Sequence, residues 1–157
     1  MLGKHKIIAA VQPYHAIDDG RWAEESIGSK RIETTYAFRS IIDSGAILTF
    51  RSDWPVAPLS PLDGVYAAVT RRTTDDKNPE GWLPEQKITV EEALSAYASS
   101  NAYAGFEEDK AGTLEKGKRA DLVILSADPR KVEPEEIRNI KVLTTIIDGE
   151  VVYQSAK

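Results

Sequence analysis

The residue best suited to catalysis or metal binding is Asp53, which closely follows the apolar segment AILTF at residues 46–50. A second apolar segment, KIIAAVQ at residues 6–12, is followed by His15. In parallel α/β folds, ligands and catalytic groups gather where the strands end, because the loops after the strands converge there. If both segments are parallel strands, Gln12, His15 and Asp53 share one rim. A carboxylate at that rim can bind a metal or take a proton from a metal-activated water.

The same residues also allow a structural interpretation, in which Asp53 caps its loop and His15 is solvated. Catalytic zinc usually needs three protein ligands and a water. The two histidines, His5 and His15, are separated by an extended segment of ~30 Å at ~3.3 Å per residue, so they cannot share one ion. Asp53 with His15 makes at most a two-ligand site, to which Asp18 or Asp19 could add a generic carboxylate. We expect this chain alone to bind no metal.

Other chemical signals are weaker. Trp54 comes directly after Asp53 and is predicted to line a pocket, whereas Trp82 is predicted to hold the polar loop of residues 73–87 against the core. No glycine-rich phosphate loop follows a predicted strand, and no nucleophile elbow is present. These absences leave the carboxylate at the strand end as the main candidate.

The region around these residues predicts a βαβ unit. Ser29 is a suitable N-cap for a helix over residues 29–44, and Gly45 follows where a left-handed residue is favoured. Residues 14–28 are polar and contain an Asp-Asp-Gly turn, so we expect an irregular loop there. Strand, helix and strand in this order predict two parallel neighbours joined by a right-handed crossover.

The character of the chain changes near residue 111. Before that point, Ser60 opens one predicted helix, and a capping box at residues 89–92 opens another that ends near Gly105. Beyond it, the pattern indicates a small β unit in which Asp148-Gly149 forms a type I′ hairpin turn. The elements expected there are a strand at residues 121–125, a short helix at 134–139, and strands at 142–147 and 151–153.

Composition limits the class of protein. The net charge of -5 and the pI near 5.1 argue against a nucleic-acid surface, and the absence of cysteine excludes disulfides and thiolate metal sites. The apolar run at residues 7–11 is too short for a signal peptide, and no run approaches the ~20 residues of a membrane span. We therefore predict a cytoplasmic protein.

Several blocks resemble one branch of the amidohydrolase superfamily, which includes N-substituted formamide deformylase. The similarity extends over nearly the whole chain. The QPxH and SDWPV patterns narrow it to this branch, whereas the ADLV pattern is typical of the superfamily. The blocks are IAAVQPYHA at residues 8–16, SDWPV at 52–56, AAVTR at 67–71, AYASSNAYA at 96–104, AGTLEKGKRADLVIL at 111–125 and TTIIDGEVVY at 144–153.

The resemblance implies an α/β fold of TIM-barrel type with a small β-sandwich. Residues 1–110 would be a partial barrel segment holding the last two strands, and residues 111–157 part of the sandwich. Asp53 would contact a divalent metal, with zinc expected, and handle the proton of the attacking water. Gln12, His15 and Trp54 would bind a small-molecule substrate. The implied reaction is metal-dependent hydrolysis of a non-peptide C–N bond in an amide or cyclic amide.

The chain departs from the family pattern in two respects. Arg51 stands where relatives usually have glycine, and the metal-binding histidines of the earlier barrel strands are absent. A complete barrel takes ~250 residues. We therefore expect the C-terminal portion of a hydrolase that is inactive alone and self-associates through exposed sheet edges. The alternatives are a non-catalytic regulatory or scaffold protein with this half of the fold, and a small α/β binding domain.

Overall fold

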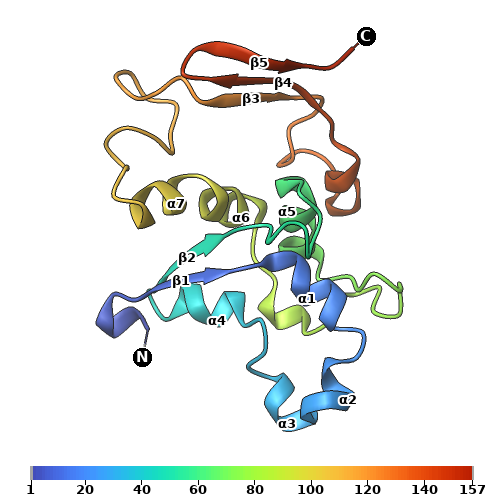
Figure 1. Ribbon diagram of the computed structural model, residues 1–157. Helices are drawn as coiled ribbons and strands as arrows, with labels where there is room; N and C mark the ends of the chain where they lie inside the picture. Colours follow the sequence, from blue (N-terminus) through green and yellow to red (C-terminus); the bar gives the residue numbers. More distant parts are fainter. Residues whose placement is uncertain (1, 157) are drawn as a thin grey trace.

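The computed structural model of the chain describes residues 2–156, which form two β-sheets joined by short helices (Figure 1). β1 (Ile8–Val11) and β2 (Ile47–Phe50) make a parallel pair, and β3 (Leu122–Leu125), β4 (Val142–Ile147) and β5 (Glu150–Gln154) make an antiparallel sheet. The α-helices are α1 (Pro13–Asp19), α2 (Ala23–Ile27), α3 (Ser29–Ile32), α4 (Phe38–Asp43), α5 (Pro61–Thr70), α6 (Val90–Tyr97) and α7 (Ser99–Ala104). The 3-10 helices are η1 (Gly3–His5), η2 (Pro84–Gln86) and η3 (Pro134–Asn139).

The predicted parallel pairing of the first two strands is confirmed. Ile8 pairs with Ile47 and Val11 with Phe50. The ladder continues one step further, because the amide of Arg51 donates to the carbonyl of Val11 at 3.1 Å. The carboxyl ends of both strands therefore lie at the same edge of the sheet.

Helices α4 and α6 cover one face of β2. The buried ring of Phe50 lies 5.5 Å from the ring of Phe38 at the start of α4 and 5.4 Å from Tyr97 at the end of α6, both edge to face. Because successive side chains of a strand point to opposite faces, Arg51 points away from this helical layer. That alternation decides which side chains can reach the mouth of the sheet.

Helix α7 lies along β2. The side-chain amide of Asn101 donates to the carbonyl of Phe50 at 2.9 Å. In a parallel ladder, neighbouring residues direct their backbone groups to opposite edges, and Arg51 is bonded to β1. The carbonyl of Phe50 therefore faces the edge of β2 that β1 does not use, and Asn101 satisfies it.

The prediction of an irregular loop at residues 14–28 is wrong, because that segment forms α1 and α2. Pro13 does more than stop β1. It occupies the first turn of α1, where its missing N–H has no helical partner to lose and its fixed φ favours the helix. The Asp-Asp-Gly sequence ends α1, since the amide of Gly20 donates to the carbonyl of Ala16.

The two long helices predicted at residues 29–44 and beyond residue 89 are each divided. The first is broken between α3 and α4, where Tyr36 has a φ of 51°. The second is broken at Ala98, whose φ of -117° and ψ of -87° separate α6 from α7. The predicted capping box is confirmed: the side chain of Thr89 accepts from the amide of Glu92.

Arg71 is a fully buried charge at the end of α5. Its guanidinium donates to the carbonyls of Trp82 at 2.7 Å and Tyr36 at 2.9 Å, and it lies over the rings of Phe38 and Trp82. Burial lowers its pKa to about 10, so it remains protonated at neutral pH. The expected role of Trp82 is confirmed, because its side chain is buried and its backbone amide donates to the carbonyl of Arg71 at 2.7 Å.

An ion pair joins α4 to α6. Nη1 and Nη2 of Arg39 donate to the two carboxylate oxygens of Glu92 at 2.9 and 2.7 Å, and Glu92 also accepts from the backbone amide of Thr89. The hydrogen bonds from Arg39, with a smaller effect from Thr89, hold the pKa of Glu92 below its ordinary 4.5. The carboxylate therefore stabilises the fold above pH 4.5, and this contribution is lost as the pH falls through the lowered pKa.

We expect Glu92→Gln to lower the free energy of unfolding by about 1 kcal/mol at neutral pH, because the pair is partly solvated. The difference from wild type should shrink as the pH falls below 4.5. Urea unfolding at pH 7 and at pH 3.5 measures both values. A difference that stays constant with pH would contradict this role of the carboxylate.

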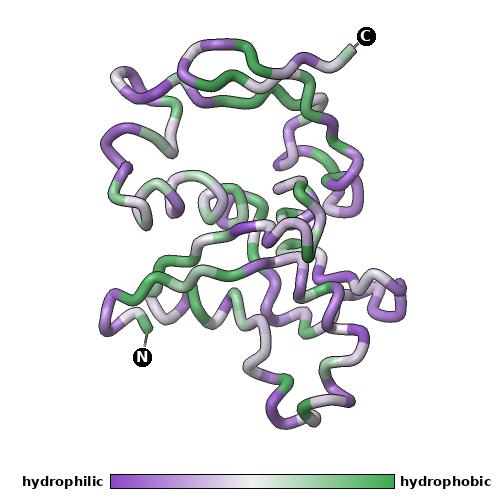
Figure 2. The backbone as a smooth tube through the Cα atoms, viewed as in Figure 1, coloured by the Kyte–Doolittle hydropathy of each residue, from purple (hydrophilic) through white to green (hydrophobic). Residues whose placement is uncertain are grey.

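The antiparallel sheet contains the three predicted strands. Asp148 and Gly149 have φ values of 51° and 81°, as a type I′ turn requires, whereas the predicted helix at residues 134–139 is a 3-10 helix. Apolar side chains are exposed on both faces of this sheet, and Figure 2 shows the hydrophobic stretches along its strands. They include Val123, Ile124, Val151, Val152 and Tyr153. Among residues 2–156, no helix has the length and apolar character of a membrane span.

Candidate active site

Asp53 and His15 meet at the carboxyl end of the parallel pair. Nε2 of His15 lies 3.5 Å from Oδ2 of Asp53. The carboxylate remains 45% exposed and the imidazole 23%, so a ligand can reach the acid while the histidine lies deeper. Nε2 is buried and has no hydrogen-bond partner among residues 2–156, because 3.5 Å is too long for a good N–H···O bond. The structure thus brings together two of the predicted site residues.

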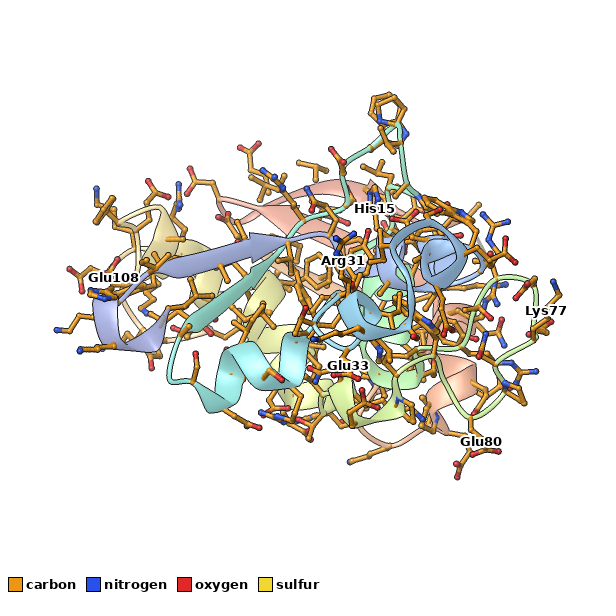
Figure 3. The ribbon with its side chains drawn as sticks, turned by 90° about the horizontal axis from the view of Figure 1, so that it is seen from below. His15, Arg31, Glu33, Lys77, Glu80 and Glu108 are labelled. Atoms are coloured by element: carbon orange, nitrogen blue, oxygen red, sulfur yellow. The ribbon has the colours of Figure 1, made fainter. Side chains whose placement is uncertain are left out.

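Local backbone geometry explains why the side chains of His15 and Asp53 lie close together. β1 ends at Val11 and α1 begins at Pro13, so His15 lies in the first turn of a helix that starts at the strand end, as Figure 3 shows. Asp53 has a φ of 64°, and its carbonyl accepts from the amides of Val56 and Ala57 at 2.8 and 3.3 Å. This tight turn after β2 holds the carboxylate beside the strand end.

The side chain of Gln12 contacts Arg51. With its amide turned toward Arg51, Oε1 of Gln12 accepts from Nε at 2.8 Å and from Nη2 at 2.9 Å. The two residues follow Val11 and Phe50, which are paired in the ladder, so they are neighbours across the strands. Arg51 therefore lies on the same rim as Asp53.

Trp54 is not enclosed. Its side chain is 64% exposed on the loop after Asp53, next to the exposed Val56 and Leu59. Its predicted place in a substrate pocket stays a prediction. Within residues 2–156, no group of three or more His, Cys, Asp or Glu side chains is placed to share one metal ion.

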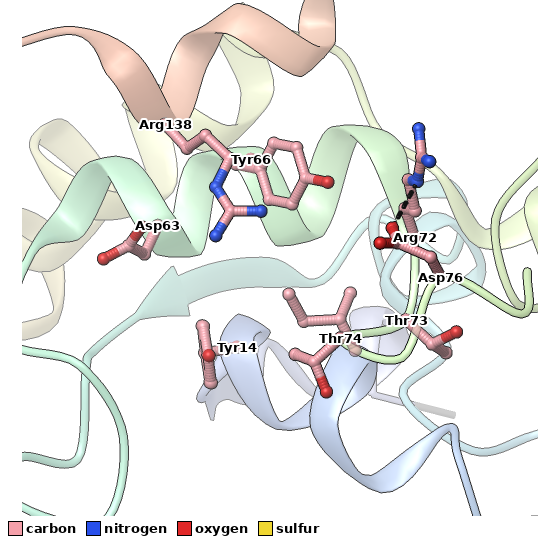
Figure 4. Close-up of a pocket in the computed structure, with 9 residues that line it drawn as sticks. Tyr14, Asp63, Tyr66, Arg72, Thr73, Thr74, Asp76 and Arg138 are labelled. Carbon is pink, nitrogen blue, oxygen red and sulfur yellow. Dashed lines mark hydrogen bonds and ion pairs between the residues drawn. The ribbon is translucent and has the colours of Figure 1, made fainter. Parts of the chain in front are cut away.

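A small cavity of about 130 Å³ lies elsewhere, between α1, α5 and η3 (Figure 4). Asp63 and Arg138 face into it, and the guanidinium of Arg138 lies 5.1 Å from the ring centre of Tyr66. Burial raises the pKa of Asp63, an effect that Arg138 opposes. Ligand pockets usually span ~300–1,000 Å³. This cavity is smaller and its lining includes neither Asp53 nor His15, so we place the candidate site at the strand ends.

Comparison with known proteins gives the chain a family. Residues 2–153 match the model of the amidohydrolase family. The chain is 36% identical over 152 residues to protein LONG AFTER FAR-RED 3 of Arabidopsis thaliana, covering 96% of this chain and 26% of that protein. It is 34% identical over 119 residues to N-substituted formamide deformylase of Arthrobacter pascens, covering 76% of this chain and 21% of the enzyme.

A solved structure supports the arrangement of the elements. An uncharacterized metal-dependent hydrolase from Pyrococcus horikoshii OT3 superimposes with a TM-score of 0.74 at 31% identity, over 85% of this chain and 27% of that one. The chain spans about a quarter of the length of the curated relatives it matches. Because the family model matches residues 2–153, this chain belongs to the amidohydrolase family.

Proposed function

We propose that this chain supplies the acid–base carboxylate of a metal-dependent hydrolase that cleaves non-peptide C–N bonds in amides or cyclic amides. The observation that carries the proposal is the carboxylate of Asp53, held exposed beside His15 at the carboxyl end of two parallel strands. Hydrolytic groups of parallel α/β folds occupy this edge. Membership of the amidohydrolase family supports hydrolase chemistry.

The proposed setting is a (β/α)₈ barrel in which β1 and β2 are the last two strands. Residues 1–110 would belong to the barrel and residues 111–157 to a β-sandwich. Two observations support this division. β1 and β2 are parallel and joined through helices, whereas the antiparallel sheet begins after residue 111 and exposes apolar side chains that a second sheet would cover.

The donor atoms at the rim fit part of a zinc site. A carboxylate oxygen and an imidazole nitrogen are both ligand types that zinc accepts. Asp53 would hold the metal as one ligand, and further ligands would come from barrel strands that this chain does not supply. When bound, a divalent metal polarises the carbonyl of the substrate and acidifies a water. Zinc as the metal, like a cytoplasmic location, stays a prediction.

The residues of this chain would have separate roles in proton transfer and substrate binding. Asp53 would accept a proton from the attacking water and deliver it to the leaving nitrogen, which requires a carboxylate within reach of both. His15 would contact the substrate through Nε2, which has no hydrogen-bond partner among residues 2–156. Gln12 and Trp54 would contact the substrate at the rim. Without the remaining strands the chain should be inactive.

A chimera tests this function. The chain would replace the segment that it matches in N-substituted formamide deformylase of Arthrobacter pascens. We expect the zinc-loaded chimera to hydrolyse an N-substituted formamide, and the isolated chain to show no hydrolysis and to bind less than one zinc per molecule. Circular dichroism and metal analysis establish that the chimera is folded and loaded. A folded, loaded and inactive chimera would contradict the proposal.

Unsatisfied strand edges lead to a prediction about association. The edge of β1 that does not face β2 is open among the described residues, and β3 and β5 are the outer strands of the second sheet. Open edges pair readily with another chain. We expect the isolated chain to form dimers or larger species at micromolar concentrations. Light scattering after size-exclusion chromatography measures the mass, and a monomer at all concentrations would count against this prediction.

A further inference from the structure

Arg51 carries a positive charge directly before Ser52 and Asp53. Phe50 packs into the layer of α4 and α6, so the strand alternation turns Arg51 to the opposite face. The side chain is exposed there. In the proposed barrel, this face of the parallel pair lines the lumen, and its carboxyl end is the mouth that a substrate enters.

Gln12 holds the guanidinium in a defined orientation. Its side-chain oxygen accepts from Nε and Nη2, which leaves Nη1 without a hydrogen-bond partner in the part of the chain that the structure describes. Arginines elsewhere, such as Arg39, Arg72 and Arg130, form ion pairs with carboxylates. Within residues 2–156, Arg51 forms no such ion pair, and its exposed guanidinium is available to a ligand.

We propose that Arg51 is a specificity-determining residue that selects substrates carrying a carboxylate beside the scissile amide. This inference rests on the proposed function and names the substrate class of that site. The guanidinium presents planar N–H donors that match a carboxylate, and its anchored position reduces the side-chain entropy lost on binding. A carboxylate bound at Arg51 would lie on the rim that also holds Asp53, and the adjacent amide could reach the acid–base group.

A purely structural role for the same contact makes different predictions. If the bond between Arg51 and Gln12 only fastened the two strand ends, its loss would lower stability and leave ligand binding unchanged. If Arg51 is the anion site, its neutralisation must weaken anionic ligands selectively. Binding to the isolated chain separates the two roles without requiring hydrolysis.

The experiment compares two ligands of nearly equal shape. N-acetylglycine is an amide with a carboxylate, and N-acetylglycinamide is its neutral counterpart. Titration is followed by NMR through the Nε–H resonance of Arg51 and the side-chain amide of Gln12. We expect saturable binding of the anion with a Kd of roughly millimolar strength, at least about fivefold tighter than the neutral amide, as suits a partly solvated ion pair. Added salt should weaken only the anion.

Matched variants decide the source of the preference. Arg51→Met keeps the length of the side chain and should abolish the fivefold preference, whereas Arg51→Lys should retain part of it. Arg72→Met, a change at an arginine paired with Asp76 beyond α5, should leave binding as in wild type. Equal binding of both ligands, no saturable binding of N-acetylglycine, or an unchanged preference in Arg51→Met would each overturn the inference. Failure of the chimera to hydrolyse amides would instead count against the proposed function.

Discussion

Asp53→Asn in the zinc-loaded chimera is expected to lower kcat by about 10³-fold, because an amide cannot accept a proton from water. Asparagine has nearly the same shape as aspartate, and the Asp53 side chain is 45% exposed. The unfolding transition should therefore change little. Steady-state kinetics on the formamide substrate, together with a thermal melt, measures both quantities.

The matched control is Asp43→Asn. Asp43 is an exposed carboxylate on α4, and it pairs with Arg39 away from the strand ends. The same chemical change there should leave kcat within about twofold of wild type, since exposed ion pairs contribute little. If both variants lose activity equally, or if Asp53→Asn keeps most of it, Asp53 is not the acid–base group.

Arg71→Lys should be the most destabilising conservative change in the chain, lowering the free energy of unfolding by about 3 kcal/mol. The guanidinium donates to two carbonyls and stacks on two rings at once. A lysine ammonium is a compact, strongly hydrated charge that cannot reproduce this planar fork. The lysine variant would still bury a positive charge, which is unfavourable, but it would lose the hydrogen bonds and ring contacts that the guanidinium makes.

Arg72→Lys is the control for this prediction, one residue further along the chain. Arg72 is partly exposed and its Nε bonds the solvated carboxylate of Asp76. We expect a change of at most about 0.5 kcal/mol there. Urea unfolding of both variants at pH 7 gives the comparison. Equal stabilities for the two variants would show that the contacts of Arg71 do not support the fold.

Much of the scaffold could be predicted, because continuous apolar runs and capping motifs are local signals. The segments at residues 6–12 and 46–50 are rich in apolar and β-branched residues, and both form strands. The capping box before α6 depends on only four consecutive residues. The parallel pairing then followed from chain connectivity, and it correctly brought Asp53 close to His15.

The features that could not be predicted depend on contacts between distant segments. Nothing local marks Arg71 as buried, because its partners Tyr36 and Trp82 come from two other loops. α1 was missed because Pro13 signals both the end of a strand and the start of a helix. The contact of Gln12 with Arg51 needs the exact register of β1 against β2, which composition does not specify.

The zinc affinity of the chimera and of its Asp53→Asn variant tests the central claim most directly, because it asks whether this carboxylate holds the metal. Competition with a chromogenic chelator gives both dissociation constants. Loss of a group that orients a metal ligand costs 10–100-fold in affinity, and loss of a ligand itself should cost at least about tenfold. We predict this loss for Asp53→Asn and an unchanged affinity for Asp43→Asn. Equal zinc affinities for wild type and Asp53→Asn would contradict the account.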